Sequence, residues 1–255
     1  MRLALLSDIH ANLQAFEACV AHARKQAVSQ WAVLGDSVGY GGNPSAVLQR
    51  VMQMAEQGAW LVKGNHDAMA VAPPEKVETI GESTAQWTHD QLSAEELRFC
   101  DQLPLTCLQG DVLLVHASAD APAAWNYIHD VGGAQRSLDA VRDSPEPGMQ
   151  EVRYVLGGHV HHQMLYYTGA GAALMPFAPT PGVAVPVPRH RRWLATVGSV
   201  GQPRDGNALA MYAVLDTVQS QIMFQRVPYD LDGAAAAIRR AGLPDFFADR
   251  LSVGR

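Results

Sequence analysis

Short apolar runs recur along the chain, and each ends at a glycine or at a cluster of polar residues. Strands that are buried on both faces of a sheet read as continuous apolar runs, so these segments predict β-strands. The predicted strands are Leu3–Leu6, Trp31–Leu34, Trp60–Val62, Val112–Val115, Tyr154–Leu156, Leu194–Val197, Leu209–Leu215 and Ile222–Val227.

Helical patterns separate the early strands. Leu13, Phe16 and Val20 recur at helical spacing, and Ser93 with Glu96 three positions later forms a capping-box signature for a second helix. Strands that alternate with helices are typical of an α/β domain.

The late part of the chain has a different pattern. From Leu194 onward two or three strands follow with little helix between them, which predicts a mixed or antiparallel sheet there. A short helical tail is expected from about Gly233. The chain has no internal repeat and no convincing domain boundary, so residues 1–255 are predicted to form a single domain.

Residues 164–188 contain no charged side chain and are long enough to span a bilayer. Five prolines after Leu174 would break such a helix and leave backbone groups unsatisfied in lipid. We therefore expect a Pro-rich surface loop or flap between two strands, an insert at about 169–192 that includes the basic cluster Arg189-His190-Arg191-Arg192.

The composition narrows the class of protein. The chain of 255 residues is 48% hydrophobic and 17% charged, which suits one large globular domain. Its net charge of −6 disfavours duplex nucleic acid or an anionic membrane as a partner. Three cysteines in no CxxC pair, and an N-terminal apolar run that breaks at Asp8, predict a reduced protein of the cytoplasm.

Polar side chains follow five of the predicted strands at the point where each ends. The carboxyl ends of strands in α/β sheets form the rim where ligands bind, so residues far apart in sequence can meet there. The residues in question are Asp8, His10, Asp36, Asn65, His66, Asp67, His116, His159 and His161.

Each of these residues has an ordinary structural interpretation by itself. Asp8 or Asp36 could cap a helix, His116 could be a core histidine, and Asn65 follows a glycine as in many turns. The combination of Asp, Asn and His favours a site for borderline or hard divalent ions such as Mn, Fe, Ni or Zn, without a thiolate. The set exceeds the needs of one ion, so two ions that share one carboxylate are expected.

The motifs SDIHAN, GDSVGYG, GNHD, LLVHAS and GGHVHH occur in this order at the predicted strand ends. They resemble the five-block signature of the calcineurin-like metallophosphoesterases. The block GSVGQPRDG at Gly198–Gly206 is similar to that of a subfamily of small bacterial phosphoesterases. The resemblance implies an α/β fold, a four-layer α-β-β-α sandwich of two mixed β-sheets flanked by helices.

The resemblance also implies a role for each polar residue. The first metal would be held by Asp8, His10, Asp36 and His161. The second would be held by Asp36, Asn65, His116 and His159, with Asp36 as the bridge. His66 would be the acid near the leaving group, and Asp67 would orient it. The cofactors would be two divalent metal ions, with Mn favoured over Fe, Ni or Zn.

The predicted reaction is hydrolysis of a small phosphate monoester or diester by a hydroxide that bridges the two ions. Arg204 could clamp a substrate phosphate or pair with Asp205, and Asn12 could contact phosphate or cap a helix. Ala11 stands where glycine is usual in the family, one of several departures that bear on substrate preference.

Other functions stay open at this point. A dinucleoside polyphosphate or cyclic-nucleotide hydrolase could use the 164–188 segment as a base-binding flap. A nuclease is disfavoured by the acidic balance, and a protein phosphatase by the lack of an evident peptide groove. The alternative outside the enzymes is a metal-bound scaffold for a protein partner, and the apolar 164–188 segment could also support a homo-oligomer.

Overall fold

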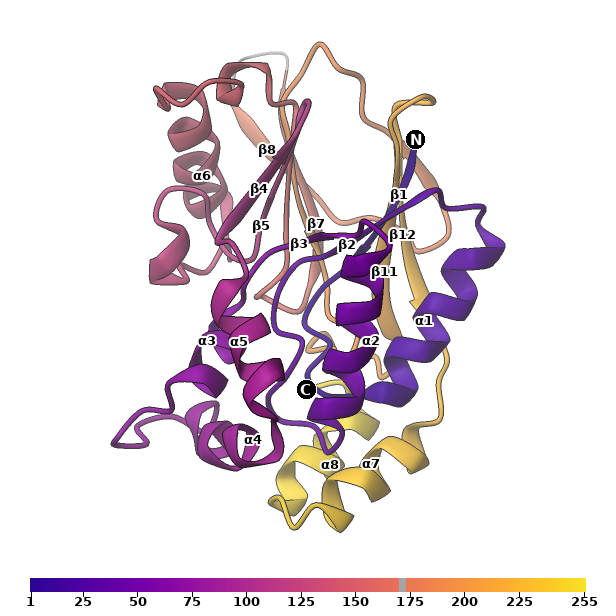
Figure 1. The fold of residues 1–255 in the computed structure, drawn as a ribbon. Helices are drawn as coiled ribbons and strands as arrows, with labels where there is room; N and C mark the ends of the chain where they lie inside the picture. The colour runs from indigo at the N-terminus through magenta and orange to yellow at the C-terminus, as the bar shows by residue number, and fades with distance from the viewer. Residues whose placement is uncertain (170–172) are drawn as a thin grey trace.

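In the computed structural model, which describes residues 1–169 and 173–255, two six-stranded sheets lie face to face (Figure 1). The first sheet has the order β3-β2-β1-β11-β12-β9 and the second β4-β5-β6-β10-β7-β8. The strands of the first sheet are β1 (Arg2–Leu6), β2 (Gln30–Val33), β3 (Trp60–Leu61), β9 (Ala184–Pro186), β11 (Ala210–Asp216) and β12 (Gln221–Val227). Those of the second are β4 (Thr106–Gln109), β5 (Val112–Val115), β6 (Tyr154–Gly157), β7 (Gln163–Thr168), β8 (Leu174–Phe177) and β10 (Trp193–Val197).

Both sheets are mixed. In the first, β1 runs parallel to β2 and antiparallel to β11. In the second, β6 runs parallel to β5 and β10, and β10 runs antiparallel to β7. The parallel strands β1, β2, β5 and β6 therefore end side by side, which brings the loops that follow them to one rim.

Helices cover the outer faces of the sheets and the rim (Figure 1). The α-helices are α1 (Leu13–Lys25), α2 (Pro44–Glu56), α3 (Asn65–Val71), α4 (Ala85–Gln91), α5 (Ala94–Gln102), α6 (Val131–Asp143), α7 (Leu231–Arg240) and α8 (Asp245–Val253). Short 3-10 helices lie at Glu82–Thr84, Pro122–Ala124 and Met149–Glu151.

The alternation of side chains along β1 builds two cores. Leu3 and Leu5 point into the core between the two sheets, whereas Ala4 and Leu6 pack with Phe16 of α1 on the outer face. All of these β1 side chains are fully buried, and burial of a leucine stabilises the fold by roughly 1.5–3 kcal/mol. β1 thus lies in the middle of the first sheet and packs against apolar side chains on both faces.

The fourth layer is α6, which packs Leu138 and Val141 against Leu113, Val155 and Leu194 of the second sheet. The predicted α-β-β-α sandwich of two mixed sheets flanked by helices is confirmed. The eight strands predicted from apolar runs are present, as are the helix that contains Leu13 and the one capped by Ser93.

The prediction of a surface loop at 164–188, and of a loop insert at about 169–192, is wrong for much of the segment. It contains most of β7 and all of β8 and β9, with residues 170–172 outside the described part of the chain. Proline lacks an N–H donor and is tolerated on edge strands. Pro176 and Pro186 lie on β8 and β9, which are the edge strands of the second and first sheets.

The helical tail expected near Gly233 consists of α7 and α8, a pair that packs Ile238 and Phe247 against Tyr40 at the rim. Among the described helices, none is both long and apolar enough to cross a membrane.

Candidate metal centre

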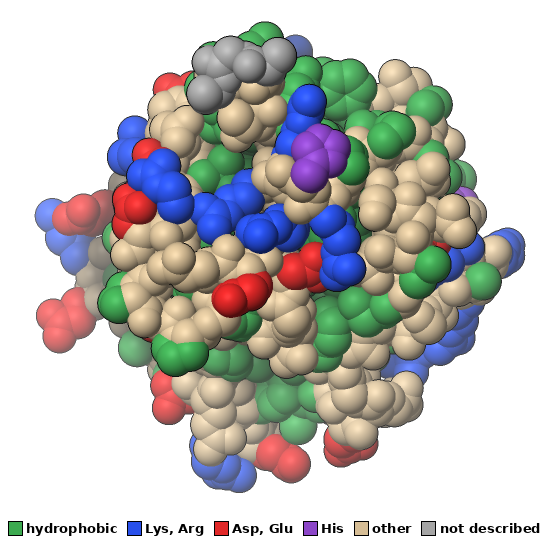
Figure 2. All heavy atoms as spheres, turned by 90° about the horizontal axis from the view of Figure 1, so that it is seen from above, with side chains coloured by type: hydrophobic (Ala, Val, Ile, Leu, Met, Phe, Trp, Pro, Cys, Tyr) green, Lys and Arg blue, Asp and Glu red, His purple; other side chains and the backbone are tan. Residues whose placement is uncertain are grey.

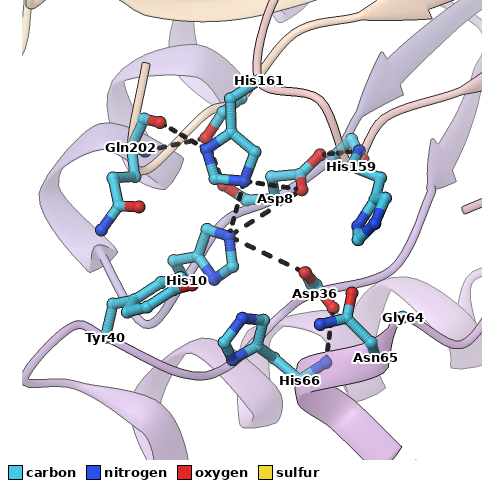
Figure 3. Close-up of polar contacts among 12 residues, drawn as sticks. Asp8, His10, Asp36, Tyr40, Gly64, Asn65, His66, His159, His161 and Gln202 are labelled. Carbon is cyan, nitrogen blue, oxygen red and sulfur yellow. Dashed lines mark hydrogen bonds and ion pairs between the residues drawn. The ribbon is translucent and has the colours of Figure 1, made fainter. Parts of the chain in front are cut away.

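The predicted ligand residues meet at the carboxyl ends of β1, β2, β3, β5 and β6 (Figure 3). The loops after β1 and β2 are joined by backbone hydrogen bonds from Asp8 to Gly35, 3.1 Å, and from His10 to Asp36, 3.0 Å. Gly64 lies so close to Asp36 that a Cβ there would collide with the carboxylate. The rim is therefore held by backbone contacts that leave no room for larger residues.

Five of these ligand residues have left-handed backbone conformations. The φ angles are 53° at Asp8, 49° at His10, 53° at Asp36, 67° at His159 and 57° at His161. This conformation costs a residue with a Cβ roughly 1–2 kcal/mol, and such residues cluster at functional sites. The tight turns aim the side chains inward as soon as each strand ends.

Ala11 shares this strain, with φ of 50°. A glycine would adopt this conformation without a steric penalty, which gives a physical reason for the glycine that is usual in the family at the position of Ala11.

One group of side chains lies around Asp8. Asp8 Oδ1 is 3.1 Å from His161 Nε2 and 3.8 Å from His10 Nε2. The two imidazole nitrogens, His10 Nε2 and His161 Nε2, are 3.1 Å apart. All three residues are buried, so their polar atoms face one another and not water.

A second group lies around His116. Its Nε2 is 3.3 Å from Asp36 Oδ2, 3.1 Å from Asn65 Oδ1 and 3.2 Å from His159 Nδ1. Asp36 stands between the two groups, because the same Oδ2 is 3.8 Å from His10 Nε2. Asp36 Oδ1 accepts a hydrogen bond from His66 N, 2.8 Å, which leaves Oδ2 directed at the centre.

Backbone carbonyls fix the orientation of three of the imidazoles. The Nδ1–H groups of His10, His116 and His161 donate to the carbonyl oxygens of Val38 (3.1 Å), Leu34 (2.7 Å) and Gln202 (2.5 Å). Each Nε2 therefore faces the centre, where it offers a lone pair whenever the imidazole is neutral. His159 is reversed, with Nδ1 toward the centre.

The donor set fits divalent cations. Asp8 Oδ1 is buried and receives no hydrogen bond, and a buried carboxylate oxygen is stabilised by a cation beside it. The close approach of imidazole nitrogens that carry lone pairs also requires a cation or a proton between them. Imidazole, carboxylate and amide oxygen suit Mn, Fe, Ni or Zn. Three clusters of ligand atoms could hold an ion, and two of them share Asp36.

The charges of the centre depend on one another. Burial raises the pKa of Asp8 and Asp36, but the facing imidazoles, His161 and His116 respectively, outweigh it and leave both pKa values lowered. Burial also opposes protonation of His116, yet the carboxylate of Asp36 outweighs it and raises the pKa of His116 to about 9. The carboxylates are therefore ionised at neutral pH and ready to bind cations.

The structure corrects the role of Asp67. Its carboxylate makes no hydrogen bond to the ring of His66. Oδ2 accepts from the backbone N–H groups of Asp36 (2.9 Å) and Gly64 (3.0 Å), and Oδ1 accepts from that of Ser37 (2.9 Å). Asp67 lies in the first turn of α3, so it ties this helix to the loop that carries Asp36.

His66 lies at the floor of the neighbouring cleft, with its ring centroid 4.4 Å from that of Tyr40 and 4.9 Å from that of His10. Burial lowers the pKa of His66 to about 4, although the charge of Asp36 opposes the shift. The ring of His66 is therefore neutral at pH 7.

Of the two roles expected for Asn12, the structure shows the helix cap. Asn12 is 4% exposed. Its Oδ1 accepts from Ala15 N, 3.1 Å, as the cap of α1, and its Nδ2 donates to Gly201 O, 2.9 Å. Both polar atoms are thus occupied within the protein, and Asn12 joins the first loop to the one after β10.

Arg204 lies on the cleft that opens from the centre, a hollow of about 710 Å³ also lined by Asn65, His66 and His159. It does not pair with Asp205, whose partner is Arg226. Its guanidinium donates to Gln202 Oε1 (2.8 Å) and to the Tyr40 hydroxyl (3.4 Å). No ion pair to a carboxylate is found for Arg204 among the described residues, so its charge is free to meet an anion.

Several cleft residues escaped the sequence analysis, among them Trp125, Tyr127 and Arg250. The Tyr127 ring stacks on His159 with centroids 4.0 Å apart, and Arg250 reaches the cleft from α8. No local motif marks these positions, because a long loop and the docking of the C-terminal helices bring them there.

The sequence profile of the calcineurin-like phosphoesterase superfamily domain matches residues 1–220. The chain belongs to this superfamily. A metallophosphoesterase from Sphaerobacter thermophilus has 31% sequence identity and a TM-score of 0.86, and the match covers 100% of this chain and 99% of that one.

Two further proteins are similar to this chain over nearly its whole length. An uncharacterized protein of Methanocaldococcus jannaschii is 29% identical over 260 residues, which covers 99% of this chain and 98% of the relative. A hypothetical protein of Pyrococcus horikoshii has the same fold at 16% identity, with a TM-score of 0.78 and coverage of 100% and 98%. Superfamily membership together with the buried His and Asp clusters indicates a metal-binding phosphoesterase.

Proposed function

We propose that this phosphoesterase hydrolyses small phosphate monoesters or diesters with two divalent ions, Mn²⁺ first among them. The observation that carries the proposal is the position of Asp36. Its Oδ2 lies 3.8 Å from His10 Nε2 on one side and 3.3 Å from His116 Nε2 on the other. One carboxylate oxygen that faces two histidine groups is the arrangement expected of a bridge between two ions.

The residues divide into two ligand sets in this proposal. Asp8, His10 and His161 would hold one ion, and Asn65, His116 and His159 the other, with Asp36 common to both. When bound, two such ions supply a hydroxide at neutral pH and neutralise charge on the phosphoryl oxygens. The carbonyl-fixed imidazoles support the sets because they need no reorientation to bind.

The remaining polar residues of the cleft act on the substrate. Arg204 would bind a phosphate oxygen through the guanidinium N–H groups that Gln202 and Tyr40 leave free. His66 would take up a proton when the phosphate binds, since a nearby anion raises the pKa of an imidazole, and would donate it to the departing alkoxide. In the free protein, burial of the His66 ring beside His10 and Tyr40 lowers its pKa, so the ring does not hold this proton at neutral pH.

The cleft suggests a substrate larger than phosphate itself. Its volume of about 710 Å³ is in the range of sites for small organic ligands, and Met69, Ile80 and Trp125 give it an apolar wall. The alcohol part of the ester would lie along this wall.

A second candidate is a hydrolase of nucleotide-type substrates, including dinucleoside polyphosphates. The aromatic rings of Trp125 and Tyr127 on the cleft support it, because a base can stack on such rings. None of the described residues of the 164–188 segment lines this cleft, so they give no support to the base-binding flap expected there.

The test is hydrolysis of p-nitrophenyl phosphate and bis-p-nitrophenyl phosphate by chelator-stripped protein, with and without Mn²⁺. Turnover should require the metal and should be lost in Asp36→Asn. Glu151→Gln serves as the matched control, since Glu151 is an exposed carboxylate far from the centre. The ratio of the two rates distinguishes monoester from diester preference.

Full activity after removal of metal, or in Asp36→Asn, would contradict the proposal. Bound metal without turnover on these esters or on dinucleoside polyphosphates would favour the scaffold, which would then bind a protein partner through a surface outside the cleft.

A further inference from the structure

A second hollow lies at the opposite end of the sheets from the metal centre. Its volume is about 540 Å³, and its lining includes Arg142, Arg153, Arg189, His190, Arg191 and Arg192. Figure 2 looks down on this end of the molecule and shows Lys and Arg side chains gathered near the middle of the face. The basic cluster Arg189–Arg192 noted in the sequence thus lines a concave site that takes no part in the metal centre.

Two of the arginines are anchored by backbone carbonyls. Arg192 donates through Nε to Val152 O (3.1 Å) and through Nη2 to Gln150 O (2.9 Å), and Arg153 donates through Nη1 to the same two carbonyls. A guanidinium has five N–H donors. Each side chain is therefore held in place while donors remain for a ligand.

The positive charge of the hollow exceeds the negative charge around it. Arg189 pairs with Asp111 at 2.8 Å, and Arg142 pairs with Asp139 and Asp143. Arg153, Arg191 and Arg192 have no ion pair among the described residues, and Arg191 lies 5.8 Å from the centroid of the Tyr167 ring. Burial lowers the pKa of Arg192, and the charges of Arg153 and Arg142 lower it further.

A chain with a net charge of −6 thus concentrates unpaired arginines in one cavity. Repulsion among these like charges is relieved by a bound anion. Arginine suits phosphate in particular, because its planar fork can make paired hydrogen bonds to two oxygens.

We propose that this hollow binds a small anion that carries two or more phosphate groups. Its volume matches a ligand of nucleotide size. A long nucleic acid fits less well, since duplex recognition needs a basic surface that extends beyond one cavity and a favourable overall charge.

The hollow is separate from the metal centre. Arg153 directly precedes β6 and Arg192 directly precedes β10, whereas His159 and His161 follow the far end of β6. The two sites therefore lie at opposite ends of the same parallel strands, and the inference does not rest on the proposed function.

The test is calorimetric titration of the full-length protein with inorganic triphosphate in buffer that contains excess Mg²⁺, so that the probe does not strip bound ions. We expect the affinity to fall at least about tenfold in Arg153→Gln, the size that loss of one charged hydrogen bond gives, and to fall also in Arg191→Gln. Arg240→Gln, at the exposed end of α7, is the matched control and should bind as the wild type does.

Two features of the design keep the outcome clear. Arg191 makes no hydrogen bond to the fold through its side chain among the described residues, so Arg191→Gln should fold even if Arg153→Gln does not. Arg204→Gln removes the arginine of the cleft and should leave triphosphate binding to the hollow intact.

Equal affinity in the wild type, Arg153→Gln and Arg191→Gln would overturn the proposal. So would a loss of all binding in Arg204→Gln, because the probe would then occupy the cleft alone. An RNA or DNA oligonucleotide that displaces triphosphate at far lower concentration would overturn it in favour of a nucleic acid, and no binding of triphosphate at millimolar concentration would overturn it outright.

Discussion

The two ends of the sandwich handle charge in opposite ways. At the carboxyl end, Asp8, Asp36 and His116 are buried, and the loops that carry both aspartates have left-handed backbone turns. At the other end, Arg142 and Arg189 are more than half exposed, with side-chain exposures of 55% and 59%. Burial and strain are concentrated where cations would bind, whereas the arginine end relies on ordinary surface groups.

This difference has a physical cause. A carboxylate can be buried only if cations or donors compensate the lost hydration, and the rim supplies imidazoles and backbone N–H groups at fixed positions. Arg142 and Arg189 keep most of their hydration at the surface and pair with carboxylates, and two backbone carbonyls hold Arg153 and Arg192. Substitutions should therefore have large effects at the carboxyl end and small effects on the fold at the other.

The largest expected effect is that of Asp36→Asn. Loss of the shared carboxylate should lower kcat/KM for bis-p-nitrophenyl phosphate by at least about 10³-fold, the upper range for removal of one group that stabilises a transition state. Glu151→Gln at the arginine end should leave the rate unchanged. A similar fall in both variants would remove the distinction between the two ends.

His66→Ala should show an effect that depends on the leaving group. General acid catalysis contributes roughly 10²–10⁴-fold, so alkyl phosphates with poor leaving groups should lose about 10²-fold or more. Esters of p-nitrophenol should lose much less, because nitrophenolate departs without a proton. Equal losses for both kinds of ester, measured as kcat, would contradict the role of His66 as the acid.

Asp67→Asn should reduce stability more than any exposed substitution. Its carboxylate accepts from the N–H groups of Asp36, Ser37 and Gly64, and an amide would present N–H donors to some of them. A buried donor left unsatisfied costs about 1–3 kcal/mol, so urea unfolding should give a free energy lower by roughly that amount. If Asp67→Asn lowered the free energy of unfolding no more than Glu151→Gln does, the carboxylate would not be what joins α3 to the rim.

The metal-free protein should lose stability as the pH falls from about 6.5 to about 4. Unfolded histidines titrate near pH 6.5, whereas burial lowers the pKa of His66 and His159 to about 4. In this window the unfolded chain binds protons that the folded chain does not. The loss can reach roughly 1.4 kcal/mol for each unit of pKa difference at each histidine.

Asp67 offsets part of this loss, because burial raises its pKa to about 7 and the folded chain then holds a proton that the unfolded carboxylate does not. His116 does not offset it. The stability that accompanies its raised pKa is fully present below pH 6.5 and disappears only as the pH rises toward about 9. Urea unfolding of chelator-treated protein across the window measures the effect, and His66→Gln should make the pH dependence shallower. A pH dependence as steep in His66→Gln as in the wild type would contradict the burial of a neutral imidazole at His66.

The smallest expected effect on catalysis is that of Arg204→Gln. A hydrogen bond to a charged group is worth about 1.5–3 kcal/mol, so KM for phosphate esters should rise roughly tenfold with a smaller change in kcat. An unchanged KM would show that Arg204 does not bind the substrate and only donates hydrogen bonds to Tyr40 and Gln202.

The sequence predicted the strands and the convergence of the site well, and the reason is physical. Short continuous apolar runs such as Leu3–Leu6, bounded by polar residues, are typical of buried strands, and a set of Asp and His residues after such strands is expected at the rim of the sheet. The edge strands β8 and β9 were missed because their prolines, Pro176 and Pro186, are tolerated only at an edge, and edges are decided by the whole fold.

The hydrogen bonds that join Asp67 and Asn12 to other loops could not be predicted, although the cap that Asn12 gives to α1 was one of its two expected roles. Asp67 accepts a hydrogen bond from the loop after β2, and Asn12 donates one to Gly201, which is 189 residues away in the sequence. The place of Arg250 on the cleft depends in the same way on how α8 packs against the rim. Local patterns carry no information on such contacts.

The most direct test of the central claim is the metal content of the protein. Protein dialysed against Mn²⁺ and then against metal-free buffer is analysed by mass spectrometry beside His161→Ala, His116→Ala and Asp36→Asn. The shared position of Asp36 predicts two ions per wild-type chain, about one in each histidine variant, and less than one in Asp36→Asn. A single ion in the wild type, or two ions retained in Asp36→Asn, would contradict a centre built around a shared carboxylate.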